Sequence, residues 1–454
     1  MKVLVINPPN MPFSEKSLLI EPIDVLTVAT FIQSSNNTVK VIDMDVKKLA
    51  PKQIKQIIKQ FQPELTIIPF DYHIPLHTSN AVKGVNIISK IAKDNNSKVI
   101  VGGKTPKHKP ELFLRNYADI IINTEMEPVL KQLIETNFQN LKQIQGISYL
   151  EKNKLKINIS CCKKINLDSL PVPDRSLIDI TDYIEVRTIL SSRGCFGKCG
   201  FCATPNFWGC WRAKSAENVV KEIEYLIQKF NAKKILFLDD NATVDKDRMK
   251  QISKLLIQKN IKCKFGCLGT ISTFDITTMK LMHQAGFRWI HYGCEFASQK
   301  VLDSLKKGIT PDQIKKTIIE TKKIGFRVRT SWIFDLPNAD EKGLKNTIEL
   351  ILKTQPDEIR AHFLALRVGS EYNSKTNCLK QQYIHNSKPN EEIKRDLNIK
   401  TIQENLDILI KQLINKNYVL VKNVKDWRNV KKLQNKNKSV KFISLCPSRY
   451  GVCW

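Results

Sequence analysis

Apolar, β-branched runs alternate with amphipathic stretches over the first 137 residues of the chain. The runs that predict strands lie at residues 3–6, 39–42, 65–69, 99–101 and 120–122. The stretches that predict helices lie at residues 22–32, 51–61, 81–92 and 128–134. This alternation is typical of a parallel sheet with helices on both faces. Residues 1–137 are therefore predicted to form a doubly wound, Rossmann-like α/β domain, with its ligand site at the carboxyl ends of the strands.

A second alternating series starts near Tyr183, after a linker over residues 138–182. The linker contains Pro171 and Pro173, which fix an extended backbone and mark a domain boundary. Six further strands are predicted, at residues 186–190, 235–238, 263–268, 289–292, 328–334 and 358–364. Six βα units are too few to close an eight-stranded barrel, so residues 183–372 are predicted to form a partial (β/α)6 TIM-type barrel. Residues 373–454 form a basic C-terminal extension, in which the pattern predicts a helix at residues 399–414.

The composition of the 454-residue chain is that of a globular protein, with 42% hydrophobic and 26% charged residues. The formal net charge is +29, but the excess is diffuse, so we interpret it as a lysine-rich surface and do not expect a nucleic-acid partner. No apolar run approaches the ~20 residues of a membrane span, and the N-terminus lacks the apolar core of a signal peptide. We therefore expect a cytoplasmic protein whose 12 Cys stay reduced, so that clustered cysteines are better interpreted as metal ligands than as disulfides.

Three of the cysteines form a C-x3-C-x2-C motif directly after the first predicted barrel strand: Cys195, Cys199 and Cys202. Glycines between and beside them allow the loop to curl around a metal cluster. Three thiolates leave one coordination position open, whereas a structural zinc site uses four ligands. The spacing therefore indicates an iron–sulfur cluster with one open iron. A zinc site completed by a remote Cys or His is the alternative.

The motif resembles that of the radical S-adenosylmethionine (SAM) superfamily. The resemblance covers about residues 185–372 and extends through Asp239-Asp240, Gly293-Cys294-Glu295 and Asp335-Leu336-Pro337. It implies that the three cysteines hold a [4Fe-4S] cluster, whose fourth iron is chelated by the amino and carboxylate groups of S-adenosylmethionine. It also implies that the reduced cluster cleaves SAM to methionine and a 5'-deoxyadenosyl radical, which removes hydrogen from an unactivated carbon.

The same resemblance implies that five side chains bind SAM: Phe201, Asp239, Asp240, Glu295 and Arg329. Phe201 would line the adenine side, and one of the two aspartates would hold the amino group. For Asp240, a helix N-cap is the alternative. Glu295 would contact the ribose or the amino group, or would instead form a solvent-exposed ion pair. Arg329 would meet the SAM carboxylate or would lie on the outer face of the barrel. No catalytic residue is assigned.

A doubly wound domain in front of such a barrel resembles the cobalamin-binding subclass of this superfamily. The implied cobalamin contacts are five residues near strand ends: Asn7, Pro8, Gly102, Gly103 and Glu125. A glycine pair allows a bulky ligand to approach the backbone, although such pairs also end strands that bind nothing. Residues 8–20 contain no His that could ligate cobalt. We interpret Asp71-Tyr72-His73, after the third strand, as an ordinary loop.

The leading hypothesis is a cobalamin-dependent radical SAM methyltransferase that methylates an unactivated carbon of a small natural-product precursor or a peptide. One alternative keeps both cofactors but uses the radical for cyclisation or rearrangement without methyl transfer. A remote alternative is a non-enzymatic basic binding module. The expected partners are the small-molecule or peptide substrate and an electron donor such as flavodoxin or ferredoxin. Cys446 and Cys453, near the end of the chain, are left without an assigned role.

Overall fold

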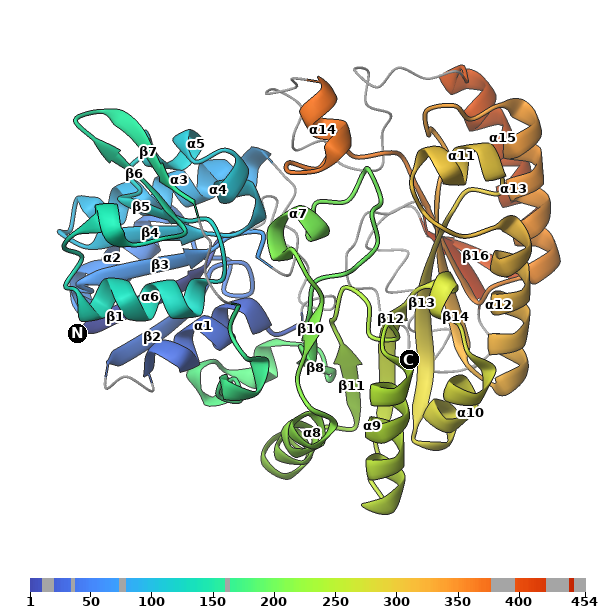
Figure 1. Ribbon diagram of the computed structural model, residues 1–454, viewed down its shortest axis with the longest axis horizontal. Helices are drawn as coiled ribbons and strands as arrows, with labels where there is room; N and C mark the ends of the chain where they lie inside the picture. Colours follow the sequence, from blue (N-terminus) through green and yellow to red (C-terminus); the bar gives the residue numbers. More distant parts are fainter. Residues whose placement is uncertain are drawn as a thin grey trace. The chain divides into compact units, whose positions relative to one another are not determined.

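The computed structural model describes residues 1–9, 20–33, 37–72, 79–159, 164–376, 397–421 and 441–444. The chain divides into two compact units (Figure 1). Unit 1 consists of Met1–Ile184, Ala203–Arg212 and Arg367–Ser374. Unit 2 consists of Glu185–Cys202, Ala213–Leu366 and Lys375–Trp454. His73, Cys446 and Cys453 lie outside the described residues.

Seven strands form the sheet of unit 1, in the order β2-β1-β3-β4-β5-β6-β7. They are β1 (Lys2–Asn7), β2 (Thr38–Asp43), β3 (Leu65–Pro69), β4 (Lys98–Gly102), β5 (Ile120–Ile122), β6 (Ile147–Glu151) and β7 (Lys154–Asn158). The first five are parallel, as predicted, and their order places the switch point of a doubly wound sheet between β1 and β3. The antiparallel hairpin of β6 and β7 extends this sheet, so part of the expected linker is a component of it.

Unit 1 contains several α-helices, most of which lie beside its sheet (Figure 1). They are α1 (Ile23–Gln33), α2 (Pro51–Phe61), α3 (Ser79–Lys93), α4 (Lys104–His108), α5 (Glu111–Leu114), α6 (Met126–Glu135) and α7 (Thr204–Trp208). Helix α1 packs with α6, and α2 packs with α3. Helix α2 begins at Pro51, a residue suited to the first helical position, and it buries Ile54 and Ile58, which are one turn apart.

The core of unit 1 includes a segment that lies far along the chain. Phe207 and Trp208 of α7 are buried with Val5, Ile67 and Tyr72 in one hydrophobic cluster. The Trp208 and Tyr72 rings lie 5.1 Å apart between centroids. The residues that directly follow Cys202 are therefore anchored in unit 1, which the alternation of strands and helices did not reveal.

Eight parallel strands form the large sheet of unit 2, in the order β16-β17-β15-β14-β13-β12-β11-β8. The six predicted barrel strands are β8 (Arg187–Ile189), β11 (Lys234–Phe237), β12 (Lys264–Gly269), β13 (Phe287–Glu295), β14 (Arg327–Ile333) and β15 (Glu358–His362). The expected partial barrel is confirmed. Its sheet is longer than predicted, because the C-terminal extension adds β16 (Tyr418–Val421) and β17 (Lys441–Ser444) beside β15.

The remaining elements of unit 2 connect these strands. They are β9 (Ser192–Arg193), α8 (Ala216–Phe230), α9 (Lys246–Gln258), α10 (Ile276–Gln284), α11 (Gln299–Ser304), α12 (Pro311–Ile324), α13 (Glu341–Thr354) and α15 (Ile399–Ile414). Two further short elements are β10 (Arg212–Ala213) and α14 (Glu371–Thr376). The helix predicted at residues 399–414 is confirmed as α15. None of the described helices is long and apolar enough to cross a membrane.

The two faces of the unit 2 sheet differ in polarity. Tyr292 of β13 hydrogen-bonds with Thr321 of α12, so this residue faces the covering helices. Successive side chains of a strand point to opposite faces, which places Trp289 and His291 on the other, inner face. Register pairs Arg329 with His291 and Glu358 with Arg329, so the inner face of the barrel carries charge.

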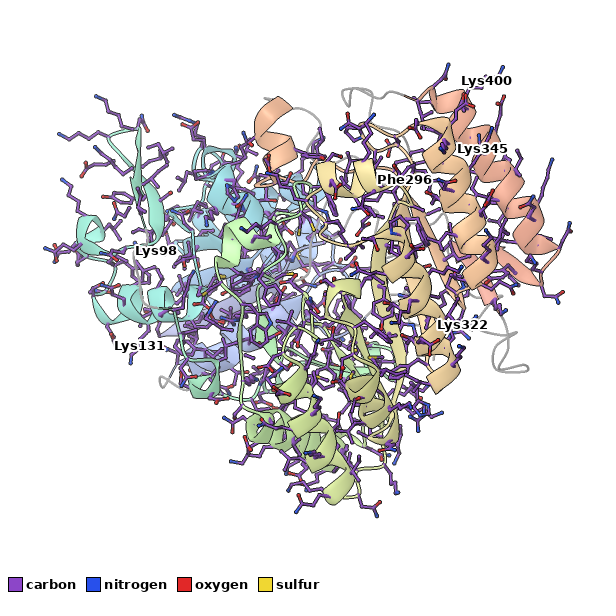
Figure 2. The ribbon with its side chains drawn as sticks, turned by 45° about the vertical axis from the view of Figure 1, so that its right-hand side comes forward. Lys98, Lys131, Phe296, Lys322, Lys345 and Lys400 are labelled. Carbon is purple, nitrogen blue, oxygen red and sulfur yellow. The ribbon has the colours of Figure 1, made fainter. Side chains whose placement is uncertain are left out.

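Exposed lysines are spread over helices of both units. Lys131 of α6, Lys345 of α13 and Lys400 of α15 point outward from the ribbon (Figure 2). This distribution agrees with the interpretation of the net charge as a lysine-rich surface.

Candidate functional site

The three cysteines of the motif lie on one loop that follows β8 and β9. The thiols of Cys195, Cys199 and Cys202 are each partly buried. A Cβ atom on Gly197 would stand 3.4 Å from the Cys195 Sγ and 3.8 Å from the Cys199 Sγ, so both sulfurs approach the bare backbone there. The loop is closed by a hydrogen bond from the Cys202 N–H to the Cys199 carbonyl (3.0 Å).

Burial in this loop favours the protonated thiols, and a nearby positive charge partly offsets this effect. Burial raises the pKa of Cys195, and burial raises the pKa of Cys199 to about 11, while the positive charge of Lys307 acts in the opposite direction on both. A metal must therefore displace the protons, as thiolate ligands require. In the parts of the chain that the structure describes, no three His, Cys, Asp or Glu side chains stand close enough to bind one metal ion.

Of the two predicted aspartates, Asp239 forms hydrogen bonds with the protein's own backbone. It is fully buried and accepts hydrogen bonds from the N–H groups of Ser191 (2.7 Å) and Ser192 (3.0 Å). Burial raises its pKa, against the opposing charge of Arg248. Asp239 thus fixes the turn between β8 and β9, from which the cysteine loop starts.

Asp240 is the aspartate that faces the cysteine loop. It is half-buried, and its charge contributes to the raised pKa of Cys195. The N-cap of the next helix, α9, is Asp245, whose side chain accepts from the Arg248 N–H (2.9 Å). The alternative role of Asp240 as a helix N-cap is therefore wrong, and its contact with SAM stays a prediction.

Glu295 forms a buried ion pair and not the solvent-exposed pair that was its alternative. Its Oε1 lies 2.7 Å from the Lys307 Nζ, and both side chains are at most 11% exposed. The backbone of Glu295 is left-handed (φ 64°), a conformation that a non-glycine residue adopts at a cost. Although burial opposes it, the Glu295 and Cys199 charges raise the pKa of Lys307 above its usual value. A charge pair thus stands beside the cysteine loop.

Arg329 lies on the inner face of the barrel, so its alternative placement on the outer face is wrong. It is buried, donates from Nε to Glu358 Oε2 (2.5 Å) and stands 4.6 Å from the centroid of the Trp289 ring. His291 hydrogen-bonds with Ser331 (2.7 Å) on the same face. Burial, and then the charges of Arg329 and Arg360, hold the pKa of His291 well below its usual range.

Phe201 is half-buried on the cysteine loop, and its adenine-binding role stays a prediction. The loop is tied to the end of α11 next to it, because the Gly200 N–H donates to the Leu305 carbonyl (3.1 Å). Sequence reasoning missed Lys307, His291 and Glu358. No motif marks these residues, and only the register of β13 to β15 and the turn after α11 bring them beside the predicted ones.

The predicted residues of β1 and β4 in unit 1 pack against the protein itself. The Asn7 side chain hydrogen-bonds the Asp43 carboxyl group, which also accepts from the Tyr183 hydroxyl (2.9 Å), and Pro8 is buried. A Cβ atom on Gly102 would stand 2.8 Å from the Met126 Sδ, and one on Gly103 would stand 1.8 Å from the Phe70 carbonyl oxygen. The glycine pair is therefore required by the fold whether or not a ligand binds there.

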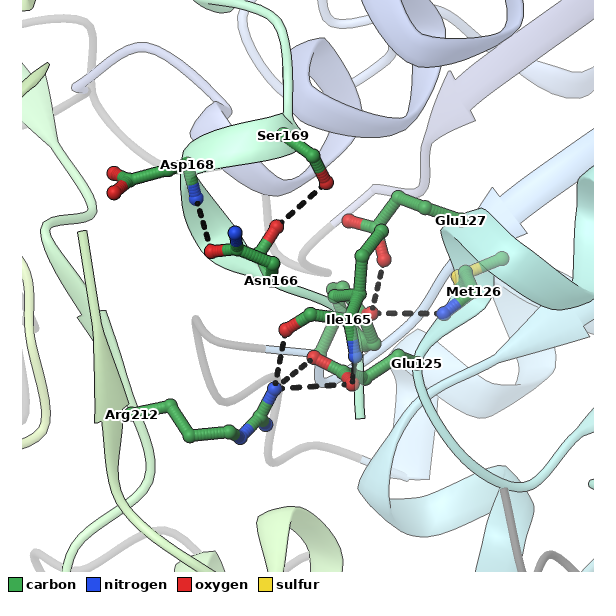
Figure 3. A network of polar contacts seen from close by, with 9 residues as sticks. Glu125, Met126, Glu127, Ile165, Asn166, Asp168, Ser169 and Arg212 are labelled. Carbon is green, nitrogen blue, oxygen red and sulfur yellow. Dashed lines mark hydrogen bonds and ion pairs between the residues drawn. The ribbon is translucent and has the colours of Figure 1, made fainter. Parts of the chain in front are cut away.

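Glu125 is also engaged by the protein (Figure 3). Its Oε1 and Oε2 lie 2.9 and 3.1 Å from the Arg212 Nη1, and Oε2 accepts from the Ile165 N–H (3.2 Å). The next residue, Met126, donates its N–H to the Tyr72 hydroxyl (2.9 Å), which in turn donates to Glu127 (3.0 Å). The turn after β5 is thus held by the Arg212 and Tyr72 side chains and by the Ile165 backbone.

A partial barrel of parallel strands with a three-cysteine loop after its first strand is the architecture of a radical SAM enzyme. Residues 189–351 match the radical SAM superfamily. These residues thus carry a radical SAM domain, and the resemblance inferred from the sequence is confirmed for this part of the chain.

Among curated proteins, an uncharacterised methyltransferase of Pyrococcus horikoshii is 29% identical over 370 residues, which cover 79% of this chain and 79% of that protein. An anaerobic magnesium-protoporphyrin IX monomethyl ester cyclase of Cereibacter sphaeroides is 25% identical over 256 residues, 53% of this chain and 42% of that protein.

Two solved structures share the fold. The radical SAM methyltransferase TsrM from Kitasatospora setae, with cobalamin and a [4Fe-4S] cluster bound, has a TM-score of 0.73 at 15% identity and covers 83% of this chain and 77% of its own. The cobalamin-dependent SAM radical enzyme OxsB, with aqua-cobalamin and SAM bound, has a TM-score of 0.73 at 17% identity and covers 96% and 68%. At these identities the likeness is one of fold, and it extends over both units.

Proposed function

We propose that the protein is a cobalamin-dependent radical SAM methyltransferase that methylates an unactivated carbon of a small molecule or a peptide. The observation that carries this proposal is the loop with three cysteines after the first barrel strand, in a chain whose preceding unit is a doubly wound sheet. TsrM and OxsB combine the same two folds and hold cobalamin. The methyltransferase name of the Pyrococcus relative supports the reaction type.

The residues present fit the two cofactors to different degrees. Cys195, Cys199 and Cys202 would hold the cluster, because they come from one loop whose glycine backbone leaves room beside two of the sulfurs. For cobalamin, the carboxyl ends of β1, β3, β4 and β5 offer the edge of a doubly wound sheet where ligands bind. When bound, the cluster would supply the electron that cleaves SAM, and the corrinoid would carry the methyl group.

The chain's own groups would bind and orient SAM and keep water out. Lys307 is a fixed positive charge beside the cysteine loop, held there by Glu295, and it would attract the carboxylate of SAM. Asp240 would attract the amino group. Arg329 is engaged by Glu358 and Trp289, so we assign it to the shape of the barrel interior and not to a direct SAM contact.

A second candidate function is a radical cyclisation or rearrangement without methyl transfer. The name of one relative, a magnesium-protoporphyrin ester cyclase, favours this candidate, although its match covers only 53% of this chain. Both candidates use the same cofactors, so the barrel site supports them equally.

The test is to incubate the anaerobically reconstituted protein with cobalamin, a strong reductant and SAM labelled in its methyl group. A methyltransferase moves label into the bound corrinoid even without substrate. Production of 5'-deoxyadenosine without labelled corrinoid would favour the second candidate. The absence of both labelled corrinoid and 5'-deoxyadenosine would overturn the proposal. A flavodoxin or ferredoxin as physiological electron donor, and a cytoplasmic location, stay predictions.

A further inference from the structure

We propose that unit 1 contains a binding site for a phosphate group, formed by Lys104, Lys107, Lys164 and Arg212. We call these four residues the basic cluster. The inference rests on the proposed function only for the source of the phosphate, which is either the nucleotide tail of cobalamin or an acidic group of the substrate.

The guanidinium group of Arg212 has two N–H donors that are available to a ligand. Its Nη1 contacts both Glu125 oxygens and the Ile165 carbonyl (3.3 Å). Its Nε and Nη2 are buried and have no hydrogen-bond partner among the described residues. These two N–H groups lie on one edge of the guanidinium plane, the edge that binds two oxygens of a phosphate or carboxylate side by side. Buried donors without partners are rare in folded proteins, and each calls for an explanation.

Lys104 is a buried ammonium group that forms no ion pair with any residue the structure describes. It is 4% exposed and donates to the Tyr72 carbonyl oxygen. Its Nζ stands 5.8 Å from the centroid of the Phe207 ring and 6.0 Å from that of the Trp208 ring. Burial of a charge is costly unless an opposite charge accompanies it, so an anion bound at Lys104 would stabilise the unit.

Two further lysines lie around the same segment, Ala203–Arg212. The Lys107 Nζ stands 5.6 Å from the Phe207 centroid and donates to the Asn206 carbonyl (2.7 Å). The Lys164 Cε lies 4.0 Å from the Cβ position of Gly209. Burial, and then the charge of Lys164, lower the pKa of Lys107. None of the three lysines forms an ion pair with a residue that the structure describes.

The location of the basic cluster is that of a ligand site. Lys104 comes two residues after β4 ends, and Glu125, the partner of Arg212, comes three residues after β5 ends. Both lie at the carboxyl ends of parallel strands in a doubly wound sheet, where ligands bind. Cobalamin carries one phosphodiester in its nucleotide tail, and names of two relatives, 4'-phospho-dehydrooxetanocin synthase and cytidylyl-2-hydroxyethylphosphonate methyltransferase, include a phosphate or phosphonate compound.

The test measures binding, without turnover. Dissociation constants of the full chain are determined for hydroxocobalamin and for cobinamide, which lacks the nucleotide tail and its phosphate. The melting temperature is then measured with inorganic phosphate against chloride at matched ionic strength. The variants are Arg212→Lys, which keeps the charge but loses the two-donor edge, and Lys104→Met, which removes the buried charge and fills its space. Arg175→Lys is the matched control, because Arg175 is a buried arginine of the same unit paired with Glu21.

If the cofactor phosphate is the ligand, the wild type binds cobalamin about tenfold more tightly than cobinamide, a factor typical of a charged hydrogen-bonded pair. Arg212→Lys then loses the preference, and Arg175→Lys keeps it. If the wild type shows no preference but phosphate raises its melting temperature, and does so less in both cluster variants, the site holds and the substrate supplies the phosphate.

The proposal is overturned if phosphate stabilises the wild type and both cluster variants equally, or none of them, and cobalamin shows no advantage over cobinamide. Binding of neither corrinoid would count against the proposed function, while the phosphate titration would still decide this inference. Lys104→Met keeps the test decisive if Arg212→Lys fails to fold, because removal of an unpaired buried charge is expected to leave the ligand-free protein at least as stable.

Discussion

The two units differ in how their predicted site residues are used. In unit 2, the three cysteines lie on one loop as partly buried thiols outside any disulfide, with Asp240 and the Glu295–Lys307 pair beside them. In unit 1, Gly102, Gly103 and Glu125 are required by the protein's own packing. A sequence motif is therefore good evidence of a ligand site only where packing and hydrogen bonding within the protein do not already explain why those residues are present.

Replacement of one motif cysteine should have the largest effect on function. In Cys195→Ala, Cys199→Ala or Cys202→Ala the loop loses a cluster ligand, so reconstituted protein should lose its iron–sulfur absorbance and all production of 5'-deoxyadenosine. Cys210→Ala is the control, because Cys210 is exposed and lies in unit 1. Retention of the full iron content in all three motif variants would contradict the assignment of the loop.

Substitution of Gly103 tests whether the glycine pair serves the fold. Gly103 has φ 139°, and a Cβ atom there meets a backbone oxygen at 1.8 Å. Gly103→Ala should therefore lower the free energy of unfolding of the ligand-free protein by about 4 kcal/mol or more, measured by denaturant titration. In the control Gly308→Ala, with φ 65° and no atom within 4 Å of the Cβ position, the loss should be about 1 kcal/mol. A stable Gly103→Ala that has lost only corrinoid binding would reverse our interpretation.

The buried pair beside the cysteine loop should show a smaller effect on stability. Glu295→Gln leaves Lys307 buried without its partner, which should cost about 3 kcal/mol of unfolding free energy. The double variant Glu295→Gln with Lys307→Met should recover most of that loss. The surface pair of Lys353 and Glu349, each about 64% exposed, is the control, and Lys353→Ala should change stability by at most about 0.5 kcal/mol. Equal effects at the two pairs would show that the Glu295 pair is not effectively buried.

Asp43 of unit 1 predicts an effect on stability that depends on pH. Burial raises the pKa of this carboxyl group from 3.8 to about 6. Because the folded state then binds the proton more tightly than the unfolded state, its contribution to stability is greatest below pH 4 and declines as the pH rises through 6. The loss amounts to about 3 kcal/mol. Asp43→Asn should remove this decline, which is measured as the difference between denaturation curves of wild type and variant from pH 4 to pH 7. If the difference in unfolding free energy between wild type and Asp43→Asn were the same at every pH, the raised pKa of Asp43 would be contradicted.

Most of the fold could be predicted from the sequence, because hydrophobic periodicity is local. The strands Leu65–Pro69 and Ile120–Ile122 and the helices Pro51–Phe61 and Ile399–Ile414 have the predicted bounds. The extension strands β16 and β17 were missed. They are short, and their pairing with β15 depends on contacts far apart in the sequence.

The cysteine ligands could also be predicted, because three ligands within eight residues form a local signal. Lys307 and Arg212 could not. Lys307 reaches the site only through the turn that follows α11, and Arg212 lies in a segment that packs into unit 1 through Phe207 and Trp208. No periodicity distinguishes such residues from the many other basic residues of this chain.

The central claim is that three thiols hold a cluster with one iron open to SAM. Electron paramagnetic resonance of the reduced, anaerobically reconstituted protein, recorded with and without SAM, tests it most directly. The account predicts a [4Fe-4S] signal whose shape changes when SAM is added, and its loss in Cys199→Ala. A reduced cluster signal that is identical with and without SAM, or one that persists in Cys199→Ala, would contradict it.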